Sequence, residues 1–179
     1  MKKDNVSSKK YYNEISSSYN ELYGEEQREK IGVIKDILKK RNILKANENK
    51  KAIDLGCGTG ISSIWLKELG YEVYGFDISN KLIEIAKRDY QDINFIVFDA
   101  DKLNKLKFRK NSYHLGVSLS AFQNFKQPKK VYKEFKKICK YFIITIPEKI
   151  NKDSIDFLKD KKELEQFNCG KDIGFIYTP

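Results

Sequence analysis

The sequence contains few of the residues that build metal centres and disulfide frameworks. Its 179 residues include three cysteines, one histidine, three prolines and one tryptophan. The cysteines Cys57, Cys139 and Cys169 form no C-x-x-C pair, and their number is odd. This pattern argues against a disulfide framework and against zinc, and it fits a reducing compartment. We therefore expect no metal and a cytoplasmic location.

Long hydrophobic runs are also missing. No apolar run approaches the roughly 18 residues that a membrane-spanning helix needs. The first residues, Met1 to Asn5, lack the apolar stretch of a secretory signal. We expect neither secretion nor a membrane span, and the length of 179 residues fits a single domain, 1–179, with one sizeable core.

Positive charge is in excess, with a net charge of +10. Residues 126–140 hold seven lysines and one acid, Glu134. Such clusters attract anionic partners such as RNA. However, Val131, Phe135 and Ile138 recur at helical spacing in the same segment, so the lysines are equally well explained as the solvated face of a helix. RNA binding on this basic face stays open as an alternative.

The most informative stretch is residues 52–60. An apolar, strand-like approach reaches Asp54, and Gly56, Gly58 and Gly60 then alternate before a helix-like pattern begins. Glycine permits a sharply bent backbone that lies close to a ligand, and the following helix directs unpaired N–H groups at the turn. The dinucleotide fingerprint is G-x-G-x-x-G, and this spacing differs from it. An acid on the strand favours a ligand with an ammonium group, such as an amino-acid-bearing nucleoside.

The string Asp-Leu-Gly-Cys-Gly-Thr-Gly at 54–60 resembles the first motif of the class I, Rossmann-like S-adenosylmethionine-dependent methyltransferases. The resemblance covers residues 50–147, in the register of the small type 11 methyltransferase domains. It implies a three-layer α/β fold: a mostly parallel sheet, helices on both faces and a C-terminal antiparallel strand. Residues 1–48 would form an N-terminal helical lid, 50–147 the cofactor-binding core, and 148–179 a shortened C-terminal part.

The resemblance assigns the amino-acid end of S-adenosylmethionine to Asp54 and to the turn with Gly56, Cys57, Gly58 and Gly60. The position of the ribose is predicted from the sequence pattern itself. Asp77 ends a β-rich run, where a carboxylate can accept both ribose hydroxyls, and Ile78 comes directly after it.

Asp99 and Ala100 come after the third predicted strand, 94–98, and in the family an acid here binds the adenine amino group. We expect Asp101 to cap a turn or short helix. Ser118, near the end of the predicted strand 113–119, is a cofactor neighbour through its backbone. Phe122, Gln123 and Asn124 face the acceptor in this interpretation.

Four tyrosines lie between residues 11 and 23. In the family this region forms helices over the cofactor, and the resemblance assigns Tyr11 and Tyr19 to the cofactor carboxylate or the acceptor pocket. The alternative is that these tyrosines only pack on an amphipathic helix. Ile31, Ile34 and Leu38 predict a core helix up to a polar break at 47–49.

Three features limit the chemistry. His114, the only histidine, starts a predicted strand and so lies at the end away from the pocket. The Asn/Asp-Pro-Pro-Tyr/Phe turn of base-amine methyltransferases is missing, and the turn directly after the fourth strand, residues 120–125, holds no cysteine to attack a pyrimidine ring. We therefore assign no catalytic residue.

The C-terminal part predicts one helix over about 153–166 and one strand at 174–177. A full methyltransferase sheet ends in an antiparallel pair, so one strand is expected to be short or absent. This would leave an open site or one completed by a partner protein.

These patterns predict an S-adenosylmethionine-dependent methyltransferase that works by in-line displacement on a small-molecule acceptor. The alternatives are an RNA or protein methyltransferase and a non-catalytic cofactor-binding subunit. A nicotinamide oxidoreductase is a more distant alternative.

Overall fold

The structure, a computed structural model, describes residues 8–44, 50–149 and 152–179. The polar break predicted at 47–49 lies outside these ranges. The helices described are α1 (Ser8–Glu14), α2 (Tyr19–Lys40), α3 (Ile61–Glu68), α4 (Asn80–Asp89), α5 (Pro128–Ile138) and α6 (Lys152–Lys159), with short 3-10 helices η1 (Ser16–Ser18), η2 (Ala100–Leu106) and η3 (Phe122–Asn124). The strands described are β1 (Lys51–Leu55), β2 (Glu72–Asp77), β3 (Asn94–Val97), β4 (Tyr113–Leu119), β5 (Cys139–Pro147), β6 (Leu164–Cys169) and β7 (Asp172–Tyr177).

The described strands form one sheet in the order β3-β2-β1-β4-β5-β7-β6. Strands β1 to β5 pair in parallel, and β7 is antiparallel to both β5 and β6. The strand order reverses between β1 and β4, and α/β sheets bind ligands beside such a reversal, at the carboxyl ends of the strands. The predicted Rossmann-like fold is confirmed.

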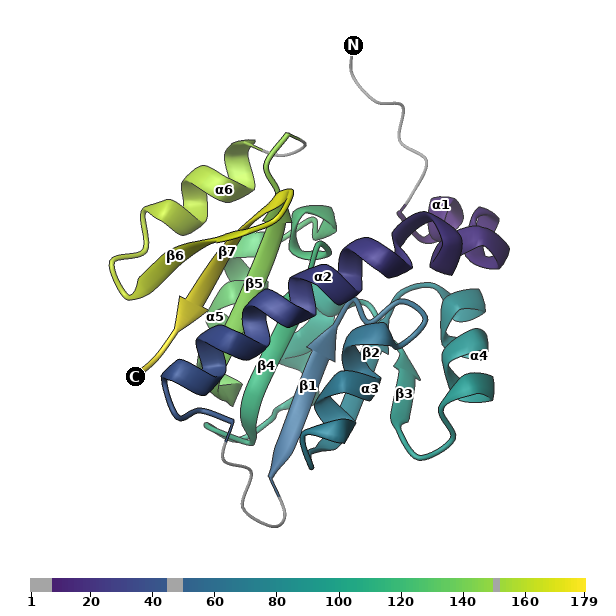
Figure 1. Ribbon diagram of the computed structural model, residues 1–179, viewed down its shortest axis with the longest axis horizontal. Coiled ribbons are helices and arrows are strands. Elements are labelled where there is room, and N and C mark those ends of the chain that lie inside the picture. The colour runs from purple at the N-terminus through teal and green to yellow at the C-terminus, as the bar shows by residue number, and fades with distance from the viewer. Residues whose placement is uncertain (1–7, 45–49, 150–151) are drawn as a thin grey trace.

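Helices cover both faces of the sheet, with α2 and α3 on one face and α5 on the other (Figure 1). Strand β1 shows how the sequence supports two cores. Ala52 contributes to the core under α2 and α3, whereas Ile53 and Leu55 contribute to the core under α5. Successive side chains of a strand point to opposite faces, so a central strand must be apolar on both.

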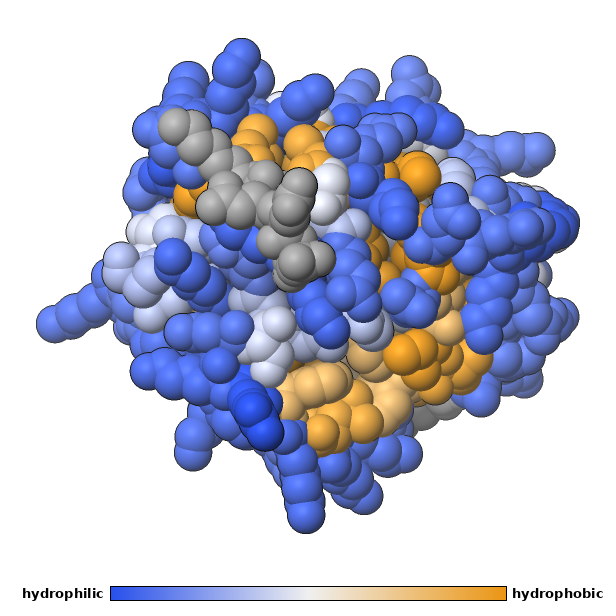
Figure 2. Space-filling view, turned by 90° about the horizontal axis from the view of Figure 1, so that it is seen from below, coloured by the Kyte–Doolittle hydropathy of each residue, from blue (hydrophilic) through white to orange (hydrophobic). Residues whose placement is uncertain are grey.

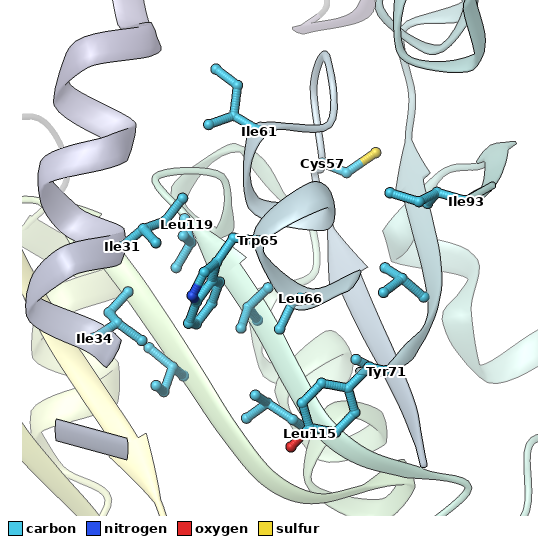
Figure 3. Packing of buried hydrophobic residues seen from close by; sticks show 14 of the residues in the cluster. Ile31, Ile34, Cys57, Ile61, Trp65, Leu66, Tyr71, Ile93, Leu115 and Leu119 are labelled. Carbon is cyan, nitrogen blue, oxygen red and sulfur yellow. The ribbon is translucent and has the colours of Figure 1, made fainter. Parts of the chain in front are cut away.

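Trp65 joins the N-terminal helix α2 to the body of the fold. In Figure 3 its ring lies beside Ile31 and Ile34 of α2, with Leu66 behind it on α3. Ile31, Ile34 and Leu38 are buried, as the helical spacing predicts. Truncating a buried tryptophan costs about 3–5 kcal/mol, so this contact contributes strongly to holding α2 in place.

The predicted C-terminal helix is wrong beyond Lys159. Helix α6 ends there, and residues Leu164–Cys169 form the edge strand β6 instead. A turn at Gly170, whose φ is +68°, leads from β6 into β7. The antiparallel pair is therefore complete, and the sheet does not lack a strand.

Helix α5 is amphipathic, as predicted, since Val131, Phe135 and Ile138 are fully buried while most of its lysines are exposed. The end of the molecule seen in Figure 2 is mostly hydrophilic, with hydrophobic side chains gathered in a smaller area. None of the helices in the described ranges is long and apolar enough to cross a bilayer.

Candidate active site

A cleft of about 820 Å³ lies at the carboxyl edge of the sheet, beside the reversal between β1 and β4. Residues 76–78, 98–101 and 119–121 supply its walls, each group at the end of a different strand. Helix α1 and the start of α2 lie beside this end of the sheet (Figure 1). The cleft therefore brings together the ends of β2, β3 and β4 with the N-terminal helices.

The glycine turn borders this cleft and is held by β2. Gly56, Gly58 and Gly60 have φ values of +77°, +54° and +91°, a region that side chains with a Cβ rarely adopt. The N–H groups of Gly56 and Cys57 both donate to the carbonyl oxygen of Phe76. A Cβ on Gly58 would lie 2.8 Å from the hydroxyl of Tyr19, so the turn also needs glycine to accommodate the lid.

Asp77 ends β2 and lines the cleft, as predicted. Its Oδ2 accepts the N–H of Gly58 at 2.9 Å, and its Oδ1 accepts the N–H of Ser79 at 2.8 Å. Burial raises the pKa of this carboxyl, while the backbone N–H groups oppose that shift. Asp77 therefore fixes the glycine turn and the start of α4 against each other. Ser79 is the N-cap of α4.

Asp99 and Ala100 line the same cleft, after the neighbouring strand β3. The Asp99 side chain accepts the N–H of Asp101 at 3.1 Å and caps η2. Asp101 accepts the N–H groups of Lys126 and Gln127, at 3.0 and 2.8 Å, and so holds the chain that leads into α5. The cap of η2 is therefore Asp99 and not Asp101, so the capping role predicted for Asp101 is wrong, and its carboxylate instead ties η2 to the segment before α5.

Asp54 does not line the cleft. It is fully buried, and its Oδ2 accepts hydroxyl hydrogen bonds from Ser62 at 2.7 Å and Ser63 at 2.6 Å. Burial raises its pKa to about 6. Ser62 borders a smaller hollow of about 240 Å³ beside Gly56 and Tyr19, so its side chain stands between Asp54 and any ligand there. The Oδ1 atom of Asp54 has no hydrogen-bond partner among the described residues.

Several other predicted residues also lie away from the cleft. Gly60 packs toward the rings of Phe95 and Tyr90, and Ser118 is fully buried within β4. Cys57 is buried and borders only the smaller hollow. Tyr11 is 44% exposed, and its hydroxyl lies 3.1 Å from that of Tyr23. Their predicted contacts with a cofactor stay predictions.

The lid contributes Tyr12 and Tyr19 to the cleft. Tyr12 belongs to the predicted tyrosine cluster, although nothing in the sequence distinguishes it there, and its hydroxyl accepts a hydrogen bond from Asn124 at 3.0 Å. The lid is tied down further by Asn13, which accepts from the Ser79 hydroxyl at 2.6 Å. These residues come from helices whose docking against the sheet no local sequence pattern predicts. The one sequence signal for this region is the group of four tyrosines between residues 11 and 23.

A second pocket of about 1100 Å³ adjoins the first and shares Tyr12, Tyr19 and Ser120 with it. Its other walls come from α2, the end of β5 and the β6–β7 turn. Gln123 and Asn124 line the second and first pockets, respectively, whereas Phe122 is fully buried and faces neither. The prediction that Phe122 faces the acceptor is therefore not supported.

A buried ionic network lies beneath the second pocket. The Nζ of Lys30, whose side chain is 1% exposed, is 2.6 Å from Glu26 Oε1 and 2.8 Å from Asp172 Oδ1. The other Asp172 oxygen accepts the hydroxyls of Ser120 and Thr145, both at 2.7 Å. This network joins α2, β5 and β7 to Ser120, which has a left-handed φ of +51°.

The cleft suits the cofactor that the resemblance implies. It combines the Asp77 carboxylate at the end of β2, which can accept hydrogen bonds from ribose hydroxyls, with Gly56 of the turn, where a Cβ would lie 2.3 Å from Ala121. Within the described residues no group of histidine, cysteine, aspartate and glutamate side chains has metal-site geometry. The ring of His114 stacks on that of Tyr71, with 5.9 Å between the ring centroids, and its Nε2 contacts the Ile43 carbonyl oxygen. His114 therefore has a structural role, as expected.

Comparison with known proteins agrees with this geometry. A family described as "Methyltransferase domain" matches residues 53–141. Demethylmenaquinone methyltransferase from Thermotoga maritima is 34% identical over 100 residues, which span 55% of this chain and 42% of that protein. The enzyme of the same name from Paenarthrobacter aurescens is 32% identical over 91 residues, 51% of this chain and 35% of that protein. The chain thus matches less than half the length of either relative.

Solved structures match almost the whole chain. Magnesium protoporphyrin IX methyltransferase from Synechocystis PCC 6803, with bound S-adenosylmethionine, has a TM-score of 0.69 at 17% identity and covers 96% of this chain and 95% of its own. A TehB-like S-adenosylmethionine-dependent methyltransferase from Corynebacterium glutamicum has a TM-score of 0.65 at 18% identity. The match covers 91% of this chain and 97% of that protein's chain. At such low sequence identities these structural similarities show the fold alone. The family domain that matches residues 53–141 and the motif at 54–60, in a sheet with this strand order, identify the chain as a member of the class I, Rossmann-like S-adenosylmethionine-dependent methyltransferases.

Proposed function

We propose that this chain binds S-adenosylmethionine in the cleft at the carboxyl edge and transfers the methyl group to a small molecule in the second pocket. The observation that carries the proposal is the position of Asp77. It ends β2 in the wall of a cleft that also contains Asp99, and this cleft opens beside a second pocket.

We assign the ribose hydroxyls to Asp77 and the adenine to Asp99 and Ala100. The amino-acid end then lies along the glycine turn toward the hollow bordered by Ser62 and Tyr19. When bound, the cofactor supplies an electrophilic sulfonium methyl that can be displaced in line. Tyr12 and Tyr19, which line both pockets, align the two substrates and exclude water between them.

A small-molecule acceptor is favoured by the second pocket, which is walled by the lid helix α2 and by the ends of β5 and the β6–β7 turn. The relatives named above are, by their names, methyltransferases that act on demethylmenaquinone, and a phosphoethanolamine N-methyltransferase from Plasmodium falciparum is 29% identical over 79 residues. The case for a partner protein is weaker than the sequence predicts, because β6 completes the sheet.

Calorimetric titration with S-adenosylhomocysteine and with NADH tests the cofactor. We expect one site for S-adenosylhomocysteine and no heat with NADH. Replacing Asp77 by Asn should weaken binding by roughly 10- to 150-fold, the worth of hydrogen bonds to a charged group. The control is Asp101→Asn, which alters another carboxylate that lines the cleft and that, like Asp77, accepts two backbone N–H groups. Equal affinity in the Asp77→Asn variant and the parent would refute the ribose assignment.

A further inference from the structure

The excess of positive charge is confined to one part of the chain. Residues 102–140, all within the described ranges, hold 12 lysines and arginines and one acid, Glu134. The other 140 residues hold 23 lysines and arginines and 24 aspartates and glutamates. The segment 102–140 therefore carries a net charge of +11, and the rest of the chain a net charge of −1. A general enrichment in lysine would instead spread the excess along the whole chain.

The need of a helix for a solvated face does not explain this imbalance. Helix α2 also has an exposed side, and it carries five acids and five lysines or arginines. Helix α5 carries five lysines and one acid. The burial of its apolar side chains explains why the remaining positions of α5 face solvent, but not why their charge is almost all of one sign.

The cations come from two segments that form one surface. The 3-10 helix η2 packs against α5. Asp101 accepts the N–H groups of Lys126 and Gln127 before α5, and the N–H of Asn111 donates to the carbonyl oxygen of Lys137 at 3.0 Å near its end. The basic surface is defined by the exposed cations of these two segments, Lys102, Lys105, Lys107, Arg109, Lys110, Lys126, Lys129, Lys130, Lys133 and Lys137.

Few carboxylates neutralise this surface. Asp99 lies 3.4 Å from Lys102, and Glu134 lies 3.2 Å from Lys137. Glu163 pairs with the half-buried Lys136 at 2.6 Å. Among the described residues, ion pairs therefore occupy three of the 12 cations of the segment, and the others are available to an external anion.

The basic surface has no apolar centre. Leu106, at 37%, is the only exposed large hydrophobic side chain of residues 102–140, and no aromatic ring of this segment is exposed. Protein interfaces usually bury an apolar core and are depleted in lysine. A helix that lies on a membrane inserts its apolar face, whereas α5 buries that face within the protein. Single-stranded nucleic acids are usually stacked on aromatic rings.

The phosphate array of a duplex is the polyanion that fits the remaining features. Lys130, Lys133 and Lys137 recur along one side of α5 and span about 10 Å, and each strand of a duplex carries one phosphate per about 3.4 Å. Lysines contact phosphates as point charges, and Arg109 is the one arginine of the segment, so little direct reading of bases is expected.

We propose that the basic surface binds the phosphate backbone of a double-stranded nucleic acid, independently of its sequence. This inference goes beyond the proposed function and does not depend on it. Lys126 lines the cofactor cleft, but none of the 12 cations lines the second pocket, so a duplex on this surface would leave the acceptor pocket free.

Fluorescence anisotropy with a labelled duplex of about 20 base pairs, titrated between 50 and 200 mM salt, tests the proposal. About five phosphate contacts predict a slope of log affinity against log salt near −4.5. Replacing Lys105, Lys107, Lys130 and Lys133 by Gln should reduce this slope to about −1, because each lysine that contacts a phosphate contributes about one. Affinity at the lowest salt should fall at least about tenfold. A duplex of unrelated sequence should give the same values.

The matched control replaces four exposed lysines of the other core layer, Lys35, Lys39 and Lys40 of α2 and Lys87 of α4, by Gln. It lowers the net charge equally and should keep the slope of the parent. Equal losses in the two variants would show that binding follows net charge alone and would overturn the proposal. Undetectable binding of the duplex by the parent at 50 mM salt would overturn it as well.

Two other anions test the choice of partner. Polyglutamate and vesicles of phosphatidylserine with phosphatidylcholine should each compete less well than unlabelled duplex at equal concentration of charge. Stronger competition by either one would overturn the assignment to a nucleic acid. Binding of S-adenosylhomocysteine should be unchanged in both variants, because none of the substituted lysines lines the cleft. That titration also separates a failure of this proposal from a failure of the proposed function.

Discussion

Asp54 and Asp77 both occupy carboxyl ends of neighbouring parallel strands, yet only Asp77 lines the cleft. The difference lies in the hydrogen-bond donors that each carboxylate meets beyond the end of its strand. Two serines in the first turn of α3 point hydroxyls at Asp54, whereas Asp77 meets backbone N–H groups. The sequence places both acids at the right edge of the sheet, but side-chain direction depends on partners that are known only once α3 has docked.

Asp54 should make the stability of the fold depend on pH. Its pKa is raised to about 6 from 3.8, so the folded state binds a proton more tightly than the unfolded state does. The contribution of Asp54 to the free energy of unfolding is therefore highest below the ordinary pKa near 4, falls as pH rises to about 6, and is then constant. The difference corresponds to roughly 3 kcal/mol.

Replacing Asp54 by Asn removes the titrating group and keeps an oxygen for the two serine hydroxyls. We expect urea denaturation between pH 4.5 and 7 to show a weaker decline of stability in Asp54→Asn than in the parent chain. Parallel pH profiles for the two proteins would show that Asp54 is not responsible.

Glycine is required at position 58 for two reasons, the positive φ of the backbone and the close approach of Tyr19. Its φ is +54°, and a Cβ would meet the Tyr19 hydroxyl at 2.8 Å. Gly170 has a similar φ of +68°, but a Cβ there would meet nothing within 4 Å. Replacing either glycine by alanine should cost about 1 kcal/mol of backbone strain in the free energy of unfolding.

Only Gly58→Ala should also displace Tyr19 and weaken binding of S-adenosylhomocysteine. Chemical denaturation and calorimetric titration of the two variants separate these effects. Equal affinities for S-adenosylhomocysteine in Gly58→Ala and Gly170→Ala would mean that the contact between the turn and Tyr19 is irrelevant to the ligand.

At the scale of elements, β6 shows why the C-terminal prediction failed. The strand contains Glu165, Gln166 and Asn168, which are exposed because β6 is the edge of the sheet. Polar residues at a sheet edge are common because they discourage pairing with other chains, and they mask the alternation that reveals a strand. The central strands β1 and β4 are largely apolar at their buried positions and were predicted correctly.

The ionic network around Lys30 joins helix α2 to β7 and β5. Removing one partner of a buried ion pair leaves an uncompensated charge, so Lys30→Met should lower the free energy of unfolding by about 3–5 kcal/mol. Adding Asp172→Asn to Lys30→Met should restore part of the loss, because the stranded carboxylate is then neutral.

The exposed pair between Arg41 and Glu165 provides the control. It also joins the end of α2 to another element, at 2.5 Å, but the Glu165 side chain is 64% exposed. Arg41→Met should cost less than about 1 kcal/mol. Urea denaturation of five proteins checks these values: the parent, Lys30→Met, Asp172→Asn, the double variant and Arg41→Met. Strictly additive losses in the double variant would contradict the network.

At the scale of the whole molecule, motifs spaced along the chain predict the βαβ core and one wall of the cleft. Asp77, Asp99 and Ala100 were found in this way because parallel strands carry their carboxyl ends to one edge. The role of Tyr12 and the second pocket could not be predicted in this way. Both depend on the docking of α1 and α2 against residues more than 60 positions away in the sequence. No local pattern encodes such contacts.

Binding should stabilise the entire fold by mass action. At a concentration of S-adenosylhomocysteine 100 times its Kd, the free energy of unfolding should rise by about 2.7 kcal/mol. A thermal melt with and without ligand measures this rise. Asp77→Asn should gain less at the same concentration, and an equal gain would place the ligand away from Asp77.

The most direct measurement is a crystal structure of the chain with S-adenosylhomocysteine. We predict that the ribose hydroxyls lie within hydrogen-bond distance of the Asp77 carboxylate, that the adenine lies beside Asp99 and Ala100, and that the sulfur faces the second pocket between Tyr12 and Tyr19. A ligand bound outside the cleft, or one whose ribose lies away from Asp77, would contradict this prediction.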